Sequence, residues 1–205
     1  MPATRPWRST LPDSARMSLG ETRHEVVSFD DEDLILVDAQ DREIGFLDKA
    51  RAHDGEGILH RAFSLFIFNP RGELLLQQRA ADKRLWPGFW ANSCCSHPRR
   101  GEAIETAIHR RLLEELGLSC ELTFLFKFQY QAHFGAAGSE HELCHVFAGR
   151  SSQVPTVNTA EITAVRWLAP QALTTEIEQH PEHFTPWLKI EWERLQAEHA
   201  DWLRA

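Results

Sequence analysis

A chain of 205 residues with 42% hydrophobic and 25% charged side chains has the size and composition of a globular protein with a full hydrophobic core. Its formal net charge of −8 at pH 7 argues against a nucleic-acid partner, which needs a broad basic face, but leaves room for a small basic pocket around a phosphorylated ligand. No apolar run approaches the length that spans a bilayer, so we expect no membrane partner.

The first 22 residues mix Pro, Ser, Arg and Thr without periodicity, which predicts a flexible N-terminal tail. They lack the apolar segment of a secretory signal, which favours a cytoplasmic location. In a reducing compartment the four cysteines, at positions 94, 95, 120 and 144, are expected to be free thiols. No repeat or linker interrupts residues 23–205, which predicts a single domain.

Two strands separated by a polar turn are predicted within residues 33–49. A stronger hairpin is predicted at 60–79, where two apolar runs are joined by the turn residues 69–72. Residues 101–118 have the apolar spacing of a helix, and Gly117 marks its end.

The second half of the chain adds strands at 120–131 and 141–150, joined by a glycine-containing loop, and a further strand at 161–169. Two helical segments follow. The last begins at Thr185 and Pro186, an N-cap followed by proline, and its apolar stripe runs toward the end of the chain through Leu188, Trp192, Leu195 and Trp202. Strands interleaved with one early and two late helices predict an α+β fold arranged as an α/β/α sandwich.

Residues 92–98, "NSCCSHP", place two thiols and an imidazole in close succession. A disulfide between the adjacent Cys94 and Cys95 would strain the backbone. A zinc knuckle with His97 lacks a C-x-x-C pair or a second cluster at a suitable spacing. The residues themselves leave two interpretations open, a buried packing patch and a reactive thiol beside a metal.

Residues 96–118 resemble the Nudix box, G-x5-E-x7-R-E-U-x-E-E-x-G-U, in which U is a bulky aliphatic residue. Two positions depart from it: Ser96 replaces the first glycine, and Arg111 replaces the glutamate of the R-E pair. The remaining glutamates, which include Glu115, suit Mg²⁺, although "EEL" alone is more often a solvated helix face. Arginine weakens the metal cluster that activates water, whereas its guanidinium can bind phosphate directly. The helix therefore predicts diphosphate binding without hydrolysis.

Three histidines and two glutamates form a second candidate cluster: His53, His60, His97, Glu140 and Glu142. Glu140 and Glu142 are two residues apart in a predicted strand, so their carboxylates share one face and His141 lies on the other. Each residue alone is more often structural. Together they exceed the four ligands of a structural zinc and favour a five- or six-coordinate Mn²⁺, Mg²⁺, Fe²⁺ or Zn²⁺.

Four segments, in order, carry a more specific resemblance: "RAHDGEGILHRAFSLFIFN", "QQRAADKRLWPGFWANSCCSHPRRGE", "FQYQAHFGAAGSEHELCHVF" and "FTPWL". They resemble the type 1 isopentenyl-diphosphate delta-isomerases, a non-hydrolytic branch of the Nudix superfamily, over roughly residues 25–195. The resemblance implies a Nudix-like mixed sheet flanked by helices. It also implies an isoprenoid diphosphate substrate, whose double bond moves by protonation at one carbon and deprotonation at another through a carbocation-like intermediate.

The resemblance also implies roles for individual residues. Cys95 and Glu142 match the two opposed acid/base groups, and Tyr130, the only tyrosine, matches an assisting proton donor. The His/Glu cluster matches the ligands of one Mn²⁺, Mg²⁺ or Zn²⁺, and Glu115 would meet a Mg²⁺ held with the diphosphate. The remaining matches are expected to bind the substrate. Four cations would hold its diphosphate, Lys49, Arg79, Lys83 and Arg111, and the indole of Trp187 would lie against its hydrocarbon.

Plainer interpretations compete with these assignments. Lys49 and Lys83 are equally compatible with solvated surface charges, and Trp187 with a tryptophan that caps the core. Cys94 is expected to be a packing residue. For the whole chain, the competing functions are a Nudix hydrolase of another diphosphate and a binding protein without catalytic activity. The oligomeric state stays open.

Overall fold

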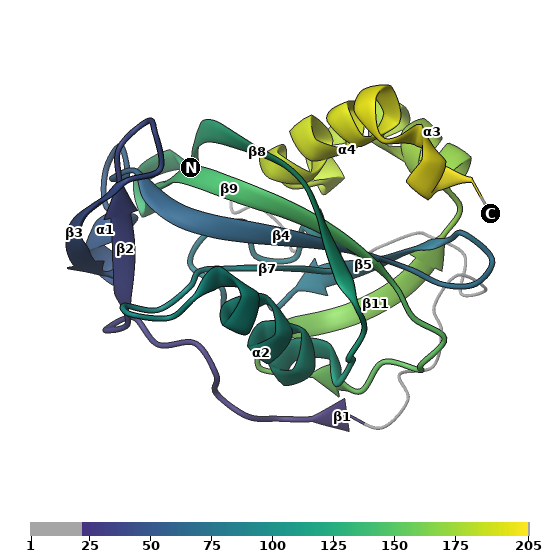
Figure 1. The fold of residues 1–205 in the computed structure, drawn as a ribbon, viewed down its shortest axis with the longest axis horizontal. Coiled ribbons are helices and arrows are strands. Elements are labelled where there is room, and N and C mark those ends of the chain that lie inside the picture. The colour runs from purple at the N-terminus through teal and green to yellow at the C-terminus, as the bar shows by residue number, and fades with distance from the viewer. Residues whose placement is uncertain (1–21, 205) are drawn as a thin grey trace, which may run out of the picture.

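The computed structural model describes residues 22–204, so the predicted N-terminal tail lies outside the described residues except for Thr22. A mixed sheet forms the centre of the molecule, with helices on both of its faces (Figure 1). Its main path runs in the order β11-β5-β4-β2-β3, and β9 joins β4 in parallel and carries β8 on its other edge. The strands of this sheet are β2 (Asp33–Val37), β3 (Glu43–Asp48), β4 (His60–Phe68), β5 (Leu74–Arg79), β6 (Trp90–Ala91), β7 (Cys94–Ser96), β8 (Leu122–His133), β9 (Ser139–Arg150) and β11 (Ile162–Leu168). A separate small pair consists of β1 (Thr22–Arg23) and β10 (Val157–Asn158).

Helices α2 (Ile104–Leu116) and α4 (Pro186–Glu198) cover opposite faces of the sheet, and α3 (Pro170–Gln179) lies beside α4 (Figure 1). The shorter helical segments are α1 (Lys49–Ala52), η2 (Gly135–Ala137), η3 (Pro181–His183) and η4 (Ala200–Leu203). The period of two in β4 explains the two cores: Phe63 and Leu65 pack under α2, whereas Phe66 and Phe68 pack under α4. The predicted α/β/α arrangement is confirmed.

The predicted helix boundaries hold for α2 and less well for the last helix. Helix α2 ends where Gly117 adopts φ 65°, and a Cβ there would lie 2.9 Å from Thr156 Cβ, so glycine is required. Helix α4 begins after Thr185 as predicted but ends at Glu198. Trp202 was therefore wrongly placed on the stripe of this helix: it lies in η4 and packs against the same core from there.

The predicted hairpin at 60–79 forms its turn but not its ladder. Asn69 and Glu73 close the turn through a 2.9 Å backbone hydrogen bond, yet β4 and β5 pair only at Phe68 and Leu74. Beyond that point the strands separate, and β7 pairs with β4 between them. Ser93 spans the gap, since its hydroxyl donates to Leu75 O (2.7 Å) and accepts from Ile67 N (2.8 Å). The segment that carries the two cysteines is thus held inside the sheet.

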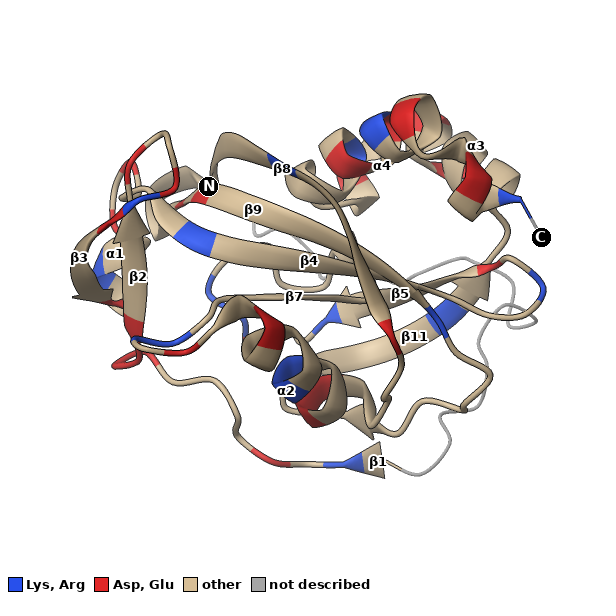
Figure 2. Ribbon diagram, viewed as in Figure 1, with Lys and Arg blue, Asp and Glu red and all other residues tan. Residues whose placement is uncertain are grey.

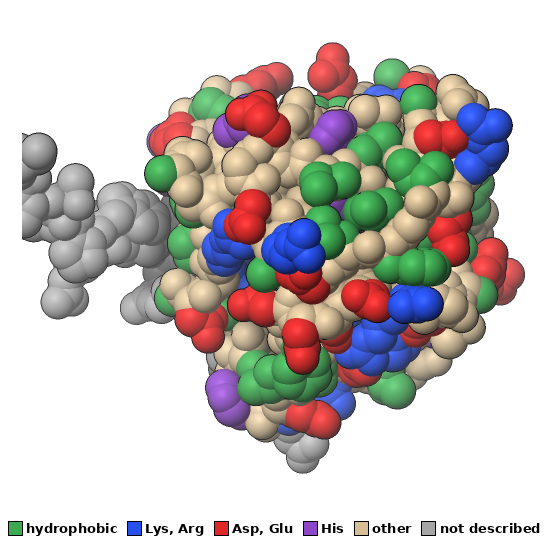
Figure 3. All heavy atoms as spheres, turned by 90° about the vertical axis from the view of Figure 1, so that its left-hand side faces the viewer, with side chains coloured by type: hydrophobic (Ala, Val, Ile, Leu, Met, Phe, Trp, Pro, Cys, Tyr) green, Lys and Arg blue, Asp and Glu red, His purple; other side chains and the backbone are tan. Residues whose placement is uncertain are grey.

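Charged side chains lie mainly on the outer surfaces. Helices α2 and α4 each carry residues of both signs (Figure 2), of which Arg111, Glu115 and Glu191 are buried. On the face that carries α1, β2 and β3, acidic and basic side chains are interspersed with small apolar patches (Figure 3). Among the described residues, no helix combines the length and the apolar character that crossing a bilayer requires.

Candidate active site

One cavity of about 320 Å³ collects nearly all of the predicted site residues, although they come from positions 49 to 187. Strands, the loops between them and the helices α1, α2 and α4 all contribute to the lining. His60 lies behind the lining, fully buried. The predicted residues that line the cavity are Lys49, His53, Arg79, Lys83, Cys95, His97, Arg111, Glu115, Tyr130, Glu140, Glu142 and Trp187.

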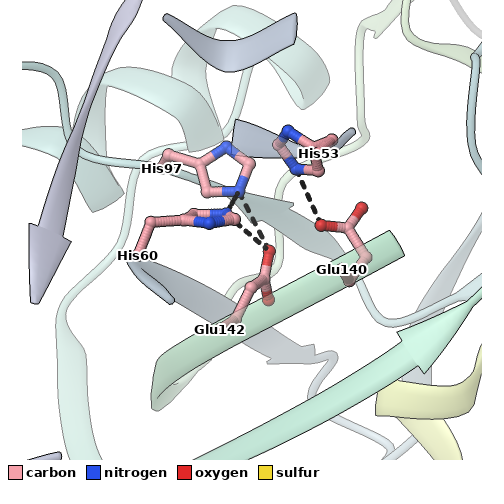
Figure 4. A group of neighbouring side chains, drawn as sticks. All are labelled: His53, His60, His97, Glu140 and Glu142. Carbon is pink, nitrogen blue, oxygen red and sulfur yellow. Dashed lines mark hydrogen bonds and ion pairs between the residues drawn. The ribbon is translucent and has the colours of Figure 1, made fainter. Parts of the chain in front are cut away.

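The three histidines and two glutamates converge at one end of this cavity (Figure 4). Glu140 and Glu142 project from the same face of β9, as their spacing predicts, toward the three imidazole rings. His53 Nε2 lies 2.8 Å from Glu140 Oε2, and His97 Nε2 lies 2.9 Å from Glu142 Oε1 and 3.1 Å from His60 Nε2. One ligand atom from each of the five residues lies within 4.8 Å of all the others.

The hydrogen bonds around the rings prepare this cluster for a cation. Nδ1 of His53 lies 2.7 Å from Lys49 O, and Nδ1 of His60 lies 2.7 Å from Ile58 O. A carbonyl only accepts, so Nδ1 carries a proton in both rings, and Nε2 of the neutral His60 presents a lone pair to the cluster. In His53 burial opposes protonation, but the charge of Glu140 outweighs it and raises the pKa of the ring, so its Nε2 offers a lone pair once that ring has lost its second proton. Burial, together with the neighbouring imidazoles, lowers the pKa of His60 to about 3, which keeps that ring neutral. The donor set therefore fits a divalent metal ion.

The buried carboxylate of Glu140 is a second feature that fits a bound cation. Glu140 Oε2 is buried and makes no hydrogen bond within the described structure, despite its 2.8 Å approach to His53. Burial opposes ionisation of this carboxyl, but the charge of His53 outweighs it and holds the pKa of Glu140 below its usual range. An ionised, buried carboxylate whose Oε2 meets only the imidazole of His53 is well suited to a metal ligand.

The adjacent cysteines lie on opposite faces of the sheet. Cys94 is fully buried in the core under α2, whereas Cys95 packs on the α4 side and lines the cavity. Burial raises the pKa of both thiols, and at Cys95 the charge of Arg79 offsets part of that effect. Cys95 is therefore a neutral thiol that faces the cavity, and Cys94 is packed in the core.

Glu142 faces two different partners with its two oxygens. Tyr130 is its cross-strand neighbour in the β8–β9 ladder, and the phenol donates a 2.7 Å hydrogen bond to Oε2. Oε1 faces His97. Burial and the adjacent Glu140 raise the pKa of Glu142 to about 7, and burial with Glu142 raises that of Tyr130 well above its usual value. This carboxyl is thus placed between the His cluster and a phenolic proton donor.

Opposite charges meet on the wall of the cavity nearest α2. The Arg111 side chain is only 3% exposed, and its Nη2 donates to Glu115 Oε1 (2.6 Å) and Glu161 Oε2 (3.3 Å). Its Nη1 donates to Val27 O at 2.8 Å. Lys83 also pairs with Glu161, so one carboxylate contacts two of the predicted diphosphate-binding cations.

The two other predicted cations are also held in place. Lys49 donates to Ser28 Oγ, and burial with the nearby charge of Lys83 lowers its pKa. The guanidinium of Arg79 donates to Leu85 O at 2.9 Å.

Trp187 lies both in the core and on the lining of the cavity. It is 3% exposed and belongs to the core under α4, yet it also lines the cavity. Its Nε1 donates a 3.1 Å hydrogen bond to Asn92 Oδ1, and the guanidinium carbon of Arg79 lies 5.2 Å from its ring centroid.

Glu161 and Arg84 are among the lining residues that were not predicted. Glu161 lies in the turn just before β11 with no motif around it, and the β11–β5 register brings it to Lys83 and Arg111. Arg84 lies in the second of the four segments that carry the family resemblance, but no role was predicted for it. Its guanidinium joins Ala50 O (2.9 Å), Ala137 O (2.8 Å) and Asp54 Oδ1 (2.6 Å), and so connects the segments that carry Lys49, Lys83 and Glu140. No local sequence pattern signals either contact.

Comparison with known proteins adds independent findings. A family model of the NUDIX domain matches residues 58–188. The chain is 44% identical to isopentenyl-diphosphate Delta-isomerase 1 of Photorhabdus laumondii, over 83% of this chain and 98% of that protein. It is 48% identical to isopentenyl-diphosphate Delta-isomerase of Serratia proteamaculans, over 77% of this chain and 87% of that protein. Among solved structures, DR0079 from Deinococcus radiodurans matches with a TM-score of 0.67 and 25% identity, over 80% of this chain and 98% of that one.

Proposed function

This chain belongs to the isopentenyl-diphosphate Delta-isomerase family and carries a NUDIX domain, and we propose that it interconverts isopentenyl diphosphate and dimethylallyl diphosphate. The observation that carries the proposal is the placement of Cys95 and the Tyr130–Glu142 pair on the lining of one cavity. Arg111, where a Nudix hydrolase has a glutamate, supports retention of the diphosphate over its cleavage.

Moving the double bond requires two proton transfers that balance. One acid gives a proton to the terminal methylene carbon, which leaves a tertiary cation at the branched carbon. One base then takes a proton from the carbon next to it on the diphosphate side, and the new double bond forms. Cys95 and Glu142 are the two groups, and Tyr130 assists Glu142 by holding or returning its proton through the 2.7 Å hydrogen bond. The reverse reaction exchanges the two roles.

The tertiary carbocation of the substrate must not react with a nucleophile in the cavity. The raised pKa of Cys95 keeps its sulfur protonated and weakly nucleophilic when the substrate arrives. The buried indole of Trp187 gives the cation an aromatic neighbour, which stabilises a desolvated cation by about 2 kcal/mol.

The diphosphate is bound by Lys49, Arg79, Lys83 and Arg111 at the cavity wall. Before substrate binds, the guanidinium of Arg111 already has two carboxylate partners, Glu115 and Glu161. Glu115 would meet the Mg²⁺ that accompanies the diphosphate, as a carboxylate partner for a hard cation.

The His/Glu cluster would hold a divalent ion, which we propose to be Mn²⁺, Mg²⁺ or Zn²⁺. Its ligands would be His53, His60, His97, Glu140 and Glu142. Such an ion would lower the pKa of Glu142 when bound. The protein itself supplies the imidazole nitrogens as ligands and the Tyr130 phenol at Glu142 Oε2. Burial of the cluster excludes water.

We further propose a single catalytic domain over residues 23–205 and a cytoplasmic location, with an isoprenoid diphosphate as partner and neither nucleic acid nor membrane. Four free thiols support a reducing compartment. Interspersed surface charges and a net charge of −8 support a small anionic substrate over a polyanion.

The test is to incubate the purified protein with isopentenyl diphosphate, Mg²⁺ and Mn²⁺ in D₂O and to follow the products by NMR. Dimethylallyl diphosphate that carries deuterium is the expected product. Release of phosphate or diphosphate would instead establish a Nudix hydrolase. Substrate recovered unchanged and unlabelled, with metal bound, would establish a binding protein or a different diphosphate substrate.

A further inference from the structure

Trp86 has an unusual backbone conformation beside the cavity. Its φ is 47°, in the left-handed region that bulky side chains avoid. The residue is nevertheless ordered within the core, and its side chain is only 4% exposed. A non-glycine residue persists in this conformation where its surroundings over-determine it, and such residues concentrate at functional sites.

The ring of Trp86 packs against the indole that lines the cavity. The planes of Trp86 and Trp187 meet at 89°, with centroids 5.4 Å apart, so one ring presents its edge to the face of the other. Phe134 supports Trp86 from another direction, with centroids 5.1 Å apart. Because Trp187 Nε1 is also tied to Asn92, the plane of Trp187 is fixed by a hydrogen bond and by a perpendicular ring.

The backbone of the same residue holds a cation of the diphosphate site. Arg79 Nε lies 3.2 Å from the carbonyl oxygens of both Leu85 and Trp86, and its Nη2 lies 2.9 Å from that of Leu85. This guanidinium is the one that lies 5.2 Å from the Trp187 centroid. Trp86 thus contacts the group at the diphosphate end through its backbone and the group at the hydrocarbon end through its ring.

We propose that Trp86 is a positioning residue, whose ring orients Trp187 so that the cationic carbon forms beside the indole while Arg79 holds the diphosphate. The inference rests on the proposed function, because it needs a substrate with both a diphosphate and a carbon that becomes cationic. It assigns the unusual conformation at residue 86 to the alignment of the two ends of the site.

Two diphosphate analogues isolate this role. One carries a tertiary ammonium in place of the branched carbon and mimics the cation, and the other is the neutral saturated 3-methylbutyl diphosphate. The ratio of their dissociation constants reports how well the indole meets a positive charge, and general stability does not affect it. In Trp86→Leu we expect the preference for the ammonium analogue to fall about tenfold, with a loss in kcat that exceeds any change in KM.

A second variant separates the ring from the backbone. Trp86→Gly retains access to the left-handed conformation and so preserves the carbonyls that hold Arg79, while it deletes the ring. Its preference for the ammonium analogue should fall as in Trp86→Leu, whereas its affinity for inorganic diphosphate should stay within about twofold of the wild type. If these truncations fail to fold, Trp86→Phe, with a smaller aromatic ring, is measured instead, and a loss of preference of about threefold is expected.

Trp192→Leu is the matched control. Trp192 is 2% exposed in the same core, and its Nε1 donates to Thr174 Oγ1 at 3.0 Å, but it is not among the described residues that line the cavity. The Trp192→Leu variant should lose stability and keep the wild-type ratio of the dissociation constants of the two analogues. An unchanged ratio in the folded Trp86 variants, alongside a wild type that isomerises its substrate, would overturn the inference. A wild type with no isomerase activity would overturn the proposed function itself.

Discussion

Tyr130 and Glu142 are joined by a 2.7 Å hydrogen bond from the phenol to Oε2, while the other carboxylate oxygen lies 2.9 Å from His97. Their pairing follows from the β8–β9 register, which places both side chains on one face of the ladder. One carboxyl group therefore connects the candidate metal cluster to the candidate proton donor.

Tyr130→Phe should lower kcat by at least about tenfold and leave KM nearly unchanged, because it removes a proton-transfer group and no substrate-binding charge. Steady-state rates of isomerisation at several substrate concentrations give both constants. Metal content and thermal stability, measured on the same preparation, show whether the cluster and the fold remain intact. A variant as fast as the wild type would remove Tyr130 from the mechanism.

Cys95→Ser and Cys94→Ser should differ sharply in their effects on activity and on stability. The first replaces the thiol that lines the cavity, so we expect a loss of activity of more than about a hundredfold with little change in stability. The second places a hydroxyl in the apolar core under α2, so we expect nearly full activity and a loss of about 1–3 kcal/mol in the free energy of unfolding. Isomerase assays and urea denaturation test the pair. Equal losses of activity would contradict the assignment of Cys95 alone to catalysis.

His60→Ala should reduce the bound metal, measured by elemental analysis after dialysis, and abolish activity. It removes one of five converging ligands, and its loss opens a buried polar space. His141→Gln is the control, since His141 points to the other side of β9 and contacts Gln129 and Gly57 O. It should bind metal as the wild type does. Equal metal content in the two variants would mean that the cluster is not the metal site.

Glu191 should make the protein less stable as the pH rises. It is fully buried on α4, and burial raises its pKa to about 8, against a small opposing effect from its contacts with Ser64 and Cys144. Between the usual carboxyl pKa and about 8, the folded state keeps a proton that the unfolded state has lost. Stability therefore falls through this window and levels off above it.

Glu191→Gln removes that dependence, because the amide never ionises. At pH 8 it should raise the free energy of unfolding by on the order of 4 kcal/mol, and at pH 4 it should change it little. Denaturation at both pH values, with the exposed Glu193→Gln as control, provides the measurement. A difference that is the same at both pH values would mean that Glu191 is ionised in the folded state.

The sequence predicted those parts of the site that rest on local spacing or on a motif. Glu140 and Glu142 share a face because a strand alternates, and α2 begins and ends near its predicted bounds because its apolar period and Gly117 are local signals. The hairpin at 60–79 was half right, since turn residues specify the turn, whereas the partner of each strand depends on distant segments.

Other features depend on contacts between distant residues, which no local pattern records. Glu161 reaches Lys83 and Arg111 only through the pairing of β11 with β5. Trp86 adopts its left-handed conformation under the packing of Phe134 and Trp187, which follow it by 48 and 101 positions. Burial of Glu191 follows from how α4 docks on the sheet, and its own sequence context would place a charged residue of a helix in solvent.

The bridge from Arg111 to Glu115 and Glu161 constrains how this site can change in evolution. Replacing Arg111 by the glutamate of the Nudix box would bring a third carboxylate beside two buried ones and would remove one of the two donors to Val27 O. Like charges in a buried space repel strongly, so the intermediate would lose stability before it gained water-activating chemistry. The identity of residue 111 is therefore tied to its two carboxylate partners, and an exchange at this position is tolerated only together with changes at Glu115 or Glu161.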